Sequence, residues 1–154
     1  MDPNEEKLKK YMIQDQIQGE HLTFKESCHS VAEAAKAAHA KEEEFVKNIC
    51  MIDDQNRLIV AIVKGEDRAS TTRVKEALNA QSVRLATPAE ILERTGYPCG
   101  GTPSFGYDAE FLIDERVMAQ EVLYSGGGSE KSLVKITSKN LIAANKGRIV
   151  RVRK

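Results

Sequence analysis

Two adjacent apolar runs constrain the fold of this chain more than any other feature of its sequence. Residues 45–52 and 58–63 are rich in β-branched and other apolar side chains, a composition typical of buried strands. Between them, the residues Asp53-Asp54-Gln55-Asn56 are those that favour a turn. The pattern therefore predicts a β-hairpin at the centre of the domain.

Helix-start signals place helices on both sides of this hairpin. Asp2 followed by Pro3 predicts an N-terminal helix. Ser30 with Glu33 forms a capping-box pattern that opens a helix through about residue 40, and 87–90 forms another that opens a helix ending at Gly96. Further helices are predicted at 70–78 and 138–144, and further strands at 20–24, 82–86, 110–113, 122–125, 133–137 and 148–152.

Strands that come in hairpins as well as singly favour a mixed α/β or α+β fold rather than a regular doubly wound one. No linker or internal repeat divides the chain. We expect one domain over residues 1–154, with a single curved mixed sheet of about six to seven strands flanked by helices.

Composition and charge exclude several classes of protein. Hydrophobic residues make up 41% and charged residues 30% of the 154, an ordinary globular mix. The 23 basic residues balance the 23 acidic ones, which argues against a nucleic-acid coat protein but allows an enzyme that touches one end of an RNA. No apolar run approaches the ~20 residues that span a bilayer. Residues 1–10 lack the apolar core of a signal peptide. We expect a cytoplasmic protein with no membrane partner.

Cysteine and histidine spacing indicates neither a metal site nor a disulfide framework. The three cysteines form no CxxC pair, and the three histidines show no ligand spacing. Dinucleotide-binding and P-loop glycine motifs are also missing from the sequence. We expect reduced thiols, no metal and no organic cofactor.

The segment 95–106, TGYPCGGTPSFG, is the most informative part of the chain. No regular element tolerates its four glycines and two prolines, so it is a loop. Glycine lets a ligand approach the main chain closely, and consecutive N–H groups in such a loop can hold an oxyanion. A purely structural turn is the alternative interpretation.

Several segments, in this order along the chain, resemble the YbaK/ProX family, relatives of the editing domain of bacterial prolyl-tRNA synthetase. The loop resembles its signature T-G-Y-x-x-G-G-x-x-P-x-G, and EFVKNI at 44–49 resembles the segment in which a lysine opens the central strand. The stretches 58–78, 84–90 and 124–129 resemble the family's next strand and helix, its approach to the loop and its second glycine turn. In two respects the chain departs from relatives. Pro103 stands one place earlier than in several of them, and strand 133–136 lacks an acidic residue that some carry.

The resemblance implies a trans-editing hydrolase that cleaves the ester of a mischarged aminoacyl-tRNA, with a small amino acid such as alanine or cysteine on tRNA for proline. Water would attack, the ribose vicinal hydroxyl would assist, and Gly100 and Gly101 would hold the oxyanion. Lys47 would anchor a phosphate or the carbonyl. The partners would be the 3′ aminoacyl-adenosine end of tRNA and an aminoacyl-tRNA synthetase. The residues expected to contact substrate are Tyr97, Thr102, Pro103, Ser104, Phe105, Gly106, Ser30, Asp114, Gly126 and Gly127.

Alternatives remain for individual residues and for the whole chain. Lys47 could be a strand-end lysine that reaches to water. Cys99 could be a nucleophile in an ester or thioester hydrolase, or a small residue in a turn. The domain could also be a non-catalytic aminoacyl- or nucleotide-binding module that docks on a synthetase. The histidines available as a base for Cys99 are His21, His29 and His39, and the basic residues that could meet RNA phosphates, or lie on a solvated terminal strand, are Lys146, Arg148, Arg151, Arg153 and Lys154.

Overall fold

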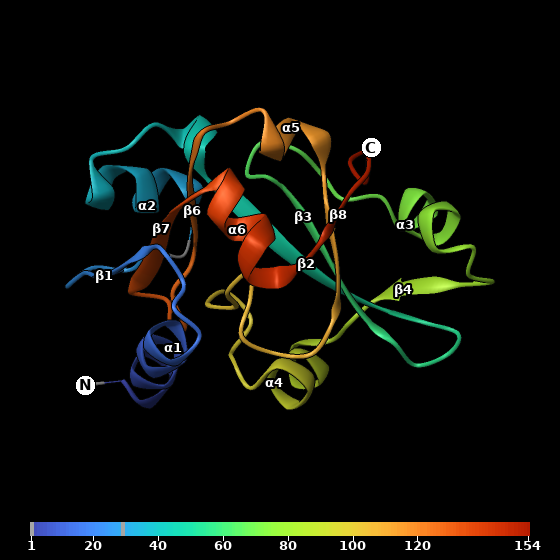
Figure 1. The fold of residues 1–154 in the computed structure, drawn as a ribbon, viewed down its shortest axis with the longest axis horizontal. Helices are drawn as coiled ribbons and strands as arrows, with labels where there is room; N and C mark the ends of the chain where they lie inside the picture. The colour runs from blue at the N-terminus through green and yellow to red at the C-terminus, as the bar shows by residue number, and fades with distance from the viewer. Residues whose placement is uncertain (1, 29) are drawn as a thin grey trace.

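The strands of the computed structural model, which describes residues 2–28 and 30–154, form two sheets (Figure 1). The larger sheet has the strand order β4-β2-β3-β5-β8 and the smaller one β1-β7-β6. The strands are β1 Glu20–Thr23, β2 Val46–Asp53, β3 Leu58–Lys64, β4 Val83–Leu85, β5 Glu110–Ile113, β6 Val122–Gly126, β7 Ser132–Thr137 and β8 Arg148–Ile149.

The predicted central hairpin is confirmed. Strands β2 and β3 pair antiparallel from Val46 opposite Lys64 to Ile52 opposite Leu58, and every residue of β3 is buried. Asp53 closes the turn by accepting hydrogen bonds from the main-chain N–H groups of Gln55 and Arg57. Strand β5 lies parallel to β3 on its other side, so β3 forms the centre of the larger sheet.

The predicted helix starts are also confirmed. Asp2 and Ser30 accept hydrogen bonds from N–H groups in the first turns of their helices. Thr87 and Glu90 form the full reciprocal capping box, and the helix after them ends at Gly96 with φ +83°. The helices are α1 Pro3–Gln14, α2 Val31–Ala38, α3 Thr71–Leu78, α4 Pro88–Thr95, α5 Glu115–Met118 and α6 Ser138–Asn145, with a short 3-10 helix at Glu42–Glu44.

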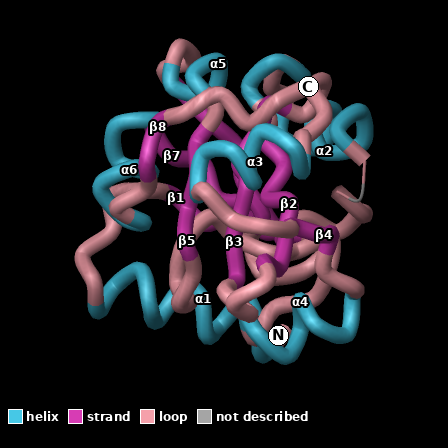
Figure 2. The backbone as a smooth tube through the Cα atoms, turned by 90° about the vertical axis from the view of Figure 1, so that its right-hand side faces the viewer, coloured by secondary structure: helices cyan, strands magenta, loops and turns pink. Residues whose placement is uncertain are grey.

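The two faces of the larger sheet belong to different clusters of the core. One face packs against α3 and the C-terminal segment, where Met51 and Val63 meet Val74 and Val152. Figure 2 shows α3 in front of this sheet, with α1 and α4 along its lower side. On the opposite face, Cys50 belongs to the cluster that contains α1, the glycine loop and the smaller sheet. Because side chains alternate along a strand, neighbouring residues of β2 point into different layers.

The mixed α/β single-domain class is confirmed, but the expected single sheet is instead two sheets with eight strands in the described part of the chain. The sheets meet where Phe45 forms a parallel bridge to Tyr124, with the two rings stacked 5.0 Å apart. The last strand is also shorter than the expected 148–152, because the chain after β8 turns toward Asp114. Among the described residues, no helix is long and apolar enough to cross a membrane.

Candidate active site

A cavity of about 230 Å³ lies between α2, the first half of β2, the glycine loop and β6. Strand β4 pairs only with Met51–Asp53 of β2, so the first half of β2 has an edge that β4 leaves uncovered. The carbonyl of Cys50 points to the β4 side, where it accepts a hydrogen bond from Ala86. The direction of the main-chain N–H and C=O groups alternates along a strand, so those of Asn48 point to the same side as those of Cys50. At Asn48 that side is the edge that β4 leaves uncovered. The residues that line the cavity are Cys28, Ser30, Val31, Ala34, Phe45, Val46, Lys47, Asn48, Ile49, Ile91, Cys99, Gly100, Thr102, Tyr124, Ser125, Gly126, Ser132 and Leu133.

Lys47 lines this cavity from the α3 face of β2 and is half-buried. Burial lowers the pKa of its ammonium, and the nearby Arg68 cation lowers it further, while Asp67 partly opposes these effects. Within the part of the chain that the structure describes, Lys47 forms no ion pair. Its ammonium is therefore available to a negatively charged or carbonyl group of a ligand.

Asn48, on the opposite face of β2, ties the glycine loop to β6. Its side-chain NH₂ donates to the carbonyl of Thr102 at 2.9 Å and to the hydroxyl of Ser125 at 3.1 Å. Its side-chain oxygen accepts from the hydroxyl of Ser104 at 2.7 Å, and the two serine hydroxyls lie 2.6 Å apart. A closed network of buried polar groups fixes geometry because each unsatisfied member would be costly. Sequence reasoning missed Asn48 and Ser125, although an asparagine inside an apolar strand was a usable signal.

We expect Asn48→Ala to lower the free energy of unfolding by about 1–3 kcal/mol, because it leaves the Thr102 carbonyl and two serine hydroxyls short of partners. Urea denaturation would measure this. Asn48→Asp keeps the size but removes the donors to Thr102, so it should also be destabilised. Asn140→Ala on α6 is the control. If both Asn48 variants are as stable as wild type, the network does not hold the loop.

Gly100 and Gly101 have different roles in the structure. Gly100 lines the cavity with φ +94°, and among the described residues its N–H has no acceptor. The N–H of Gly101 donates instead to the carbonyl of Pro98 at 3.0 Å, and its carbonyl accepts from Gly128. The prediction that Gly101 also donates to an oxyanion is therefore wrong in this conformation, and Gly100 is the candidate donor.

The second glycine turn packs directly on the glycine loop. A Cβ on Gly126 would lie 2.7 Å from the carbonyl carbon of Thr102 and still closer to its oxygen. A Cβ on Gly101 would lie 2.7 Å from the nitrogen of Ser129. Gly126 lines the cavity as expected. Gly127 does not line it, and its carbonyl accepts a hydrogen bond from the His21 ring.

Other residues of the loop signature are part of the core, contrary to the expectation that they contact substrate. The side chains of Tyr97 and Phe105 are each 1% exposed. Ser104 is fully buried in the network around Asn48, and the Pro103 carbonyl accepts from the Tyr107 hydroxyl. These aromatic and polar contacts anchor the loop on the domain.

Helix α1 holds the remaining part of the loop. Tyr11 stacks on the Phe105 ring at 6.2 Å, and Gly106 turns beside Tyr11 with φ +99°. Gly106 therefore also contributes to the scaffold and not to the cavity wall. Of the residues expected to contact substrate, those that line the cavity are Ser30, Thr102 and Gly126.

Asp114 is fully buried away from the cavity, so its expected substrate contact is also corrected. It caps α5 and accepts hydrogen bonds from the main-chain N–H groups of Val152 and Arg153 and from the Arg153 guanidinium. Burial alone would raise the pKa of this carboxyl, but the hydrogen bonds outweigh it and the pKa lies below its ordinary value. Asp114 anchors the C-terminal segment.

The thiols and histidines show no catalytic pair in the described part of the chain. Cys99 is exposed at the cavity, but His21 bonds to Gly127 and His39 ends α2 in a left-handed conformation, and neither lines the cavity. His29 lies outside the described residues. Burial raises the pKa of Cys50 to about 12. No group of three potential metal ligands occurs among the described residues.

Comparison with known families and curated proteins gives consistent matches. A model described as the aminoacyl-tRNA editing domain matches residues 25–144. The uncharacterized protein YwhH of Bacillus subtilis is 23% identical over 120 residues, which cover 77% of this chain and 76% of YwhH. The proline–tRNA ligase of Acidithiobacillus ferrooxidans is 31% identical over 71 residues, which cover 46% of this chain but only 12% of that ligase.

Solved structures match over nearly the whole chain. The hypothetical protein APE2540 has a TM-score of 0.88 at 26% identity, over 96% of this chain and 99% of that one. A candidate trans-editing enzyme for prolyl-tRNA synthetase has a TM-score of 0.92 at 21% identity, over 100% and 99% of the two chains. At that identity, the second likeness shows a shared fold.

Proposed function

The chain belongs to the aminoacyl-tRNA editing domain family, and on this premise we propose that it hydrolyses the ester between a wrong amino acid and the 3′-terminal adenosine of a tRNA. The observation that carries the proposal is that Lys47 and Gly100 line one cavity. A cationic side chain and a main-chain donor there can act on the same carbonyl. The substrate we propose is alanine or cysteine on tRNA for proline. The match to proline–tRNA ligase supports this choice of tRNA, and a cavity of about 230 Å³ has room for a small aminoacyl group.

The chemistry we propose needs positioning more than proton transfer. The N–H of Gly100 donates to the oxygen that becomes negative as water adds to the ester carbonyl, and Lys47 binds the carbonyl side or an adjacent phosphate. Among the described residues, no Asp, Glu or His lines the cavity, and in this proposal the ribose vicinal hydroxyl assists the attacking water. The labile ester makes such a site sufficient.

A deacylation panel tests this function directly. The purified protein would be mixed with tRNA for proline charged with alanine, cysteine or proline, and with a second tRNA charged with alanine. Release of alanine or cysteine, with proline retained, supports the proposal. Binding of every charged tRNA without release would favour the non-catalytic module instead.

Cys99→Ser should retain most of the deacylation rate, because water and not the thiol attacks the ester. The absence of a described histidine partner supports this expectation. Single-turnover rates on the preferred charged tRNA would measure it, with thiol alkylation of the wild type as a parallel test. A folded Cys99→Ser protein that has lost its activity would assign the chemistry to the thiol.

A further inference from the structure

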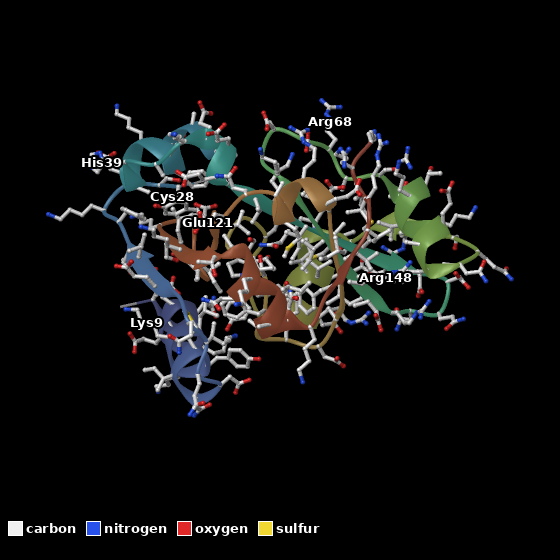
Figure 3. The ribbon with its side chains drawn as sticks, turned by 45° about the horizontal axis from the view of Figure 1, so that its top comes forward. Lys9, Cys28, His39, Arg68, Glu121 and Arg148 are labelled. Carbon is white, nitrogen blue, oxygen red and sulfur yellow. The ribbon has the colours of Figure 1, made fainter. Side chains whose placement is uncertain are left out.

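The connection between β3 and α3, residues 65–70, contacts two residues that line the cavity. The N–H of Gly65 donates to the Phe45 carbonyl at 2.7 Å, and Gly65 packs on Val31 of α2. Both Phe45 and Val31 line the cavity. Three residues further along, Arg68 is exposed, and Figure 3 shows its guanidinium projecting outward from this connection. Phe45 lies two residues before Lys47, so this connection lies beside the strand that carries Lys47.

The C-terminal segment adds further cations beside Arg68. The N–H of Lys154 donates to the Arg68 carbonyl at 2.8 Å, and Arg153 forms an antiparallel bridge with Ala69. The guanidinium of Arg151 donates to the Lys154 carbonyl at 3.2 Å. Arg68, Arg151 and Lys154 are all exposed. We call Lys47, Arg68, Arg151 and Lys154 the basic rim.

Four acidic side chains on or beside the segments that carry the basic rim are paired with other cations. Glu66 lies within ion-pair distance of both Lys64 and Arg116, and Asp67 bonds to Arg116 at 2.7 Å. Arg153 pairs with the carboxylates of Asp114 and Glu115.

The cations of the basic rim itself have no such partner. Among the described residues, none of the four forms an ion pair with an Asp or Glu side chain. These four cations therefore stay available to negatively charged groups of a ligand.

We propose that the basic rim binds backbone phosphates of the tRNA acceptor end, and so directs the 3′ adenosine into the cavity. This inference rests on the proposed function. Exposed arginine and lysine side chains bind phosphates without reading sequence, and fix the register of the RNA on the protein. The C-terminal basic residues therefore form two groups. Arg151 and Lys154 lie beside Arg68 and belong to the basic rim. Arg153 is paired with acids and Arg148 bonds to the Ala77 carbonyl, so neither belongs to it.

Uncharged tRNA for proline provides a binding test that requires no hydrolysis. Dissociation constants would be measured by filter binding at several salt concentrations for wild type, Arg68→Gln, Arg151→Gln and the double variant. Each phosphate that the variant no longer binds should reduce the slope of log affinity against log salt by about 0.7–0.9, so the slope of the double variant should fall by about 1.4–1.8. Its KM for charged tRNA should rise several-fold, with kcat at saturation unchanged.

Arg148→Gln is the matched control, because it removes one positive charge from the same C-terminal segment at a site that Figure 3 shows well apart from Arg68. The proposal is supported if the slope falls in the Arg68 and Arg151 variants and Arg148→Gln keeps it. It is overturned if all variants keep the wild-type slope, or if the slope of Arg148→Gln falls as much. The proposal is also overturned if the Arg68 and Arg151 variants lose binding to a synthetase while their affinity for tRNA stays intact. An inactive wild type that binds tRNA through the basic rim would reject the hydrolytic function alone.

Discussion

Replacing Lys47 with alanine should lower kcat/KM for deacylation at least tenfold, which corresponds to about 1.4 kcal/mol of transition-state stabilisation. The ammonium lines the cavity, is half-buried and has no ion-pair partner among the described residues, so little in the fold depends on it. We therefore expect an unchanged melting temperature. Steady-state deacylation and thermal denaturation of the same preparation would measure both quantities.

Lys139→Ala, on the exposed side of α6, is the control for removing a lysine that does not line the cavity. The pH dependence gives a second readout. Because burial and Arg68 lower the pKa of Lys47, its ammonium is lost at a lower pH than that of an ordinary lysine. The advantage of wild type over Lys47→Ala should therefore shrink as pH rises through this lowered pKa. Near-normal turnover by a folded Lys47→Ala protein would remove Lys47 from the mechanism.

Local patterns in the sequence predicted the fold's elements well. The hairpin, the capping residues and the glycine loop follow from propensities that act within a few residues, and the structure confirms them. The division into two sheets depends on contacts such as Phe45 with Tyr124, which are remote in sequence. Such pairings leave no local signature, and the single expected sheet was wrong for that reason.

The site was predicted less completely than the fold. Lys47 and Gly100 do share a cavity, but a motif does not say which of its residues face a ligand and which face the core. Tyr97, a fixed position of the signature, and Phe105, one of its variable positions, are both buried and anchor the loop. The N–H of Gly101 is used by a turn bond that only the folded backbone reveals.

Helix α1 is a further contribution that the loop motif could not indicate. It lies before the residues that match the family model, yet the Lys7 ammonium donates to the Gly96 carbonyl and lies 4.2 Å from the centre of the Tyr97 ring. Glu5, only 4% exposed, accepts a hydrogen bond from the hydroxyl of Ser129, which follows the second glycine turn. Both glycine segments are therefore fixed from the same helix.

Gly126→Ala should reduce deacylation by about 100-fold or more, the usual effect of misplacing one oxyanion donor. The new Cβ would overlap the Thr102 carbonyl, so the loop that carries Gly100 must move away from β6. The overlap is with main-chain atoms, which no side-chain rotation can relieve. The melting temperature should also fall, and the rate must be measured at a temperature where circular dichroism shows a folded protein.

The control and a companion variant separate loop displacement from general damage. In Gly19→Ala the nearest atom to the new Cβ is the Lys135 carbonyl oxygen at 3.3 Å, on the smaller sheet and away from the cavity lining, so its rate should stay near wild type. Gly101→Ala meets Ser129 across the same contact between glycine segments and should lose activity as Gly126→Ala does. If folded Gly126→Ala is destabilised but turns over normally, the close packing of the two glycine segments serves stability alone, and the oxyanion donor must be sought outside the loop.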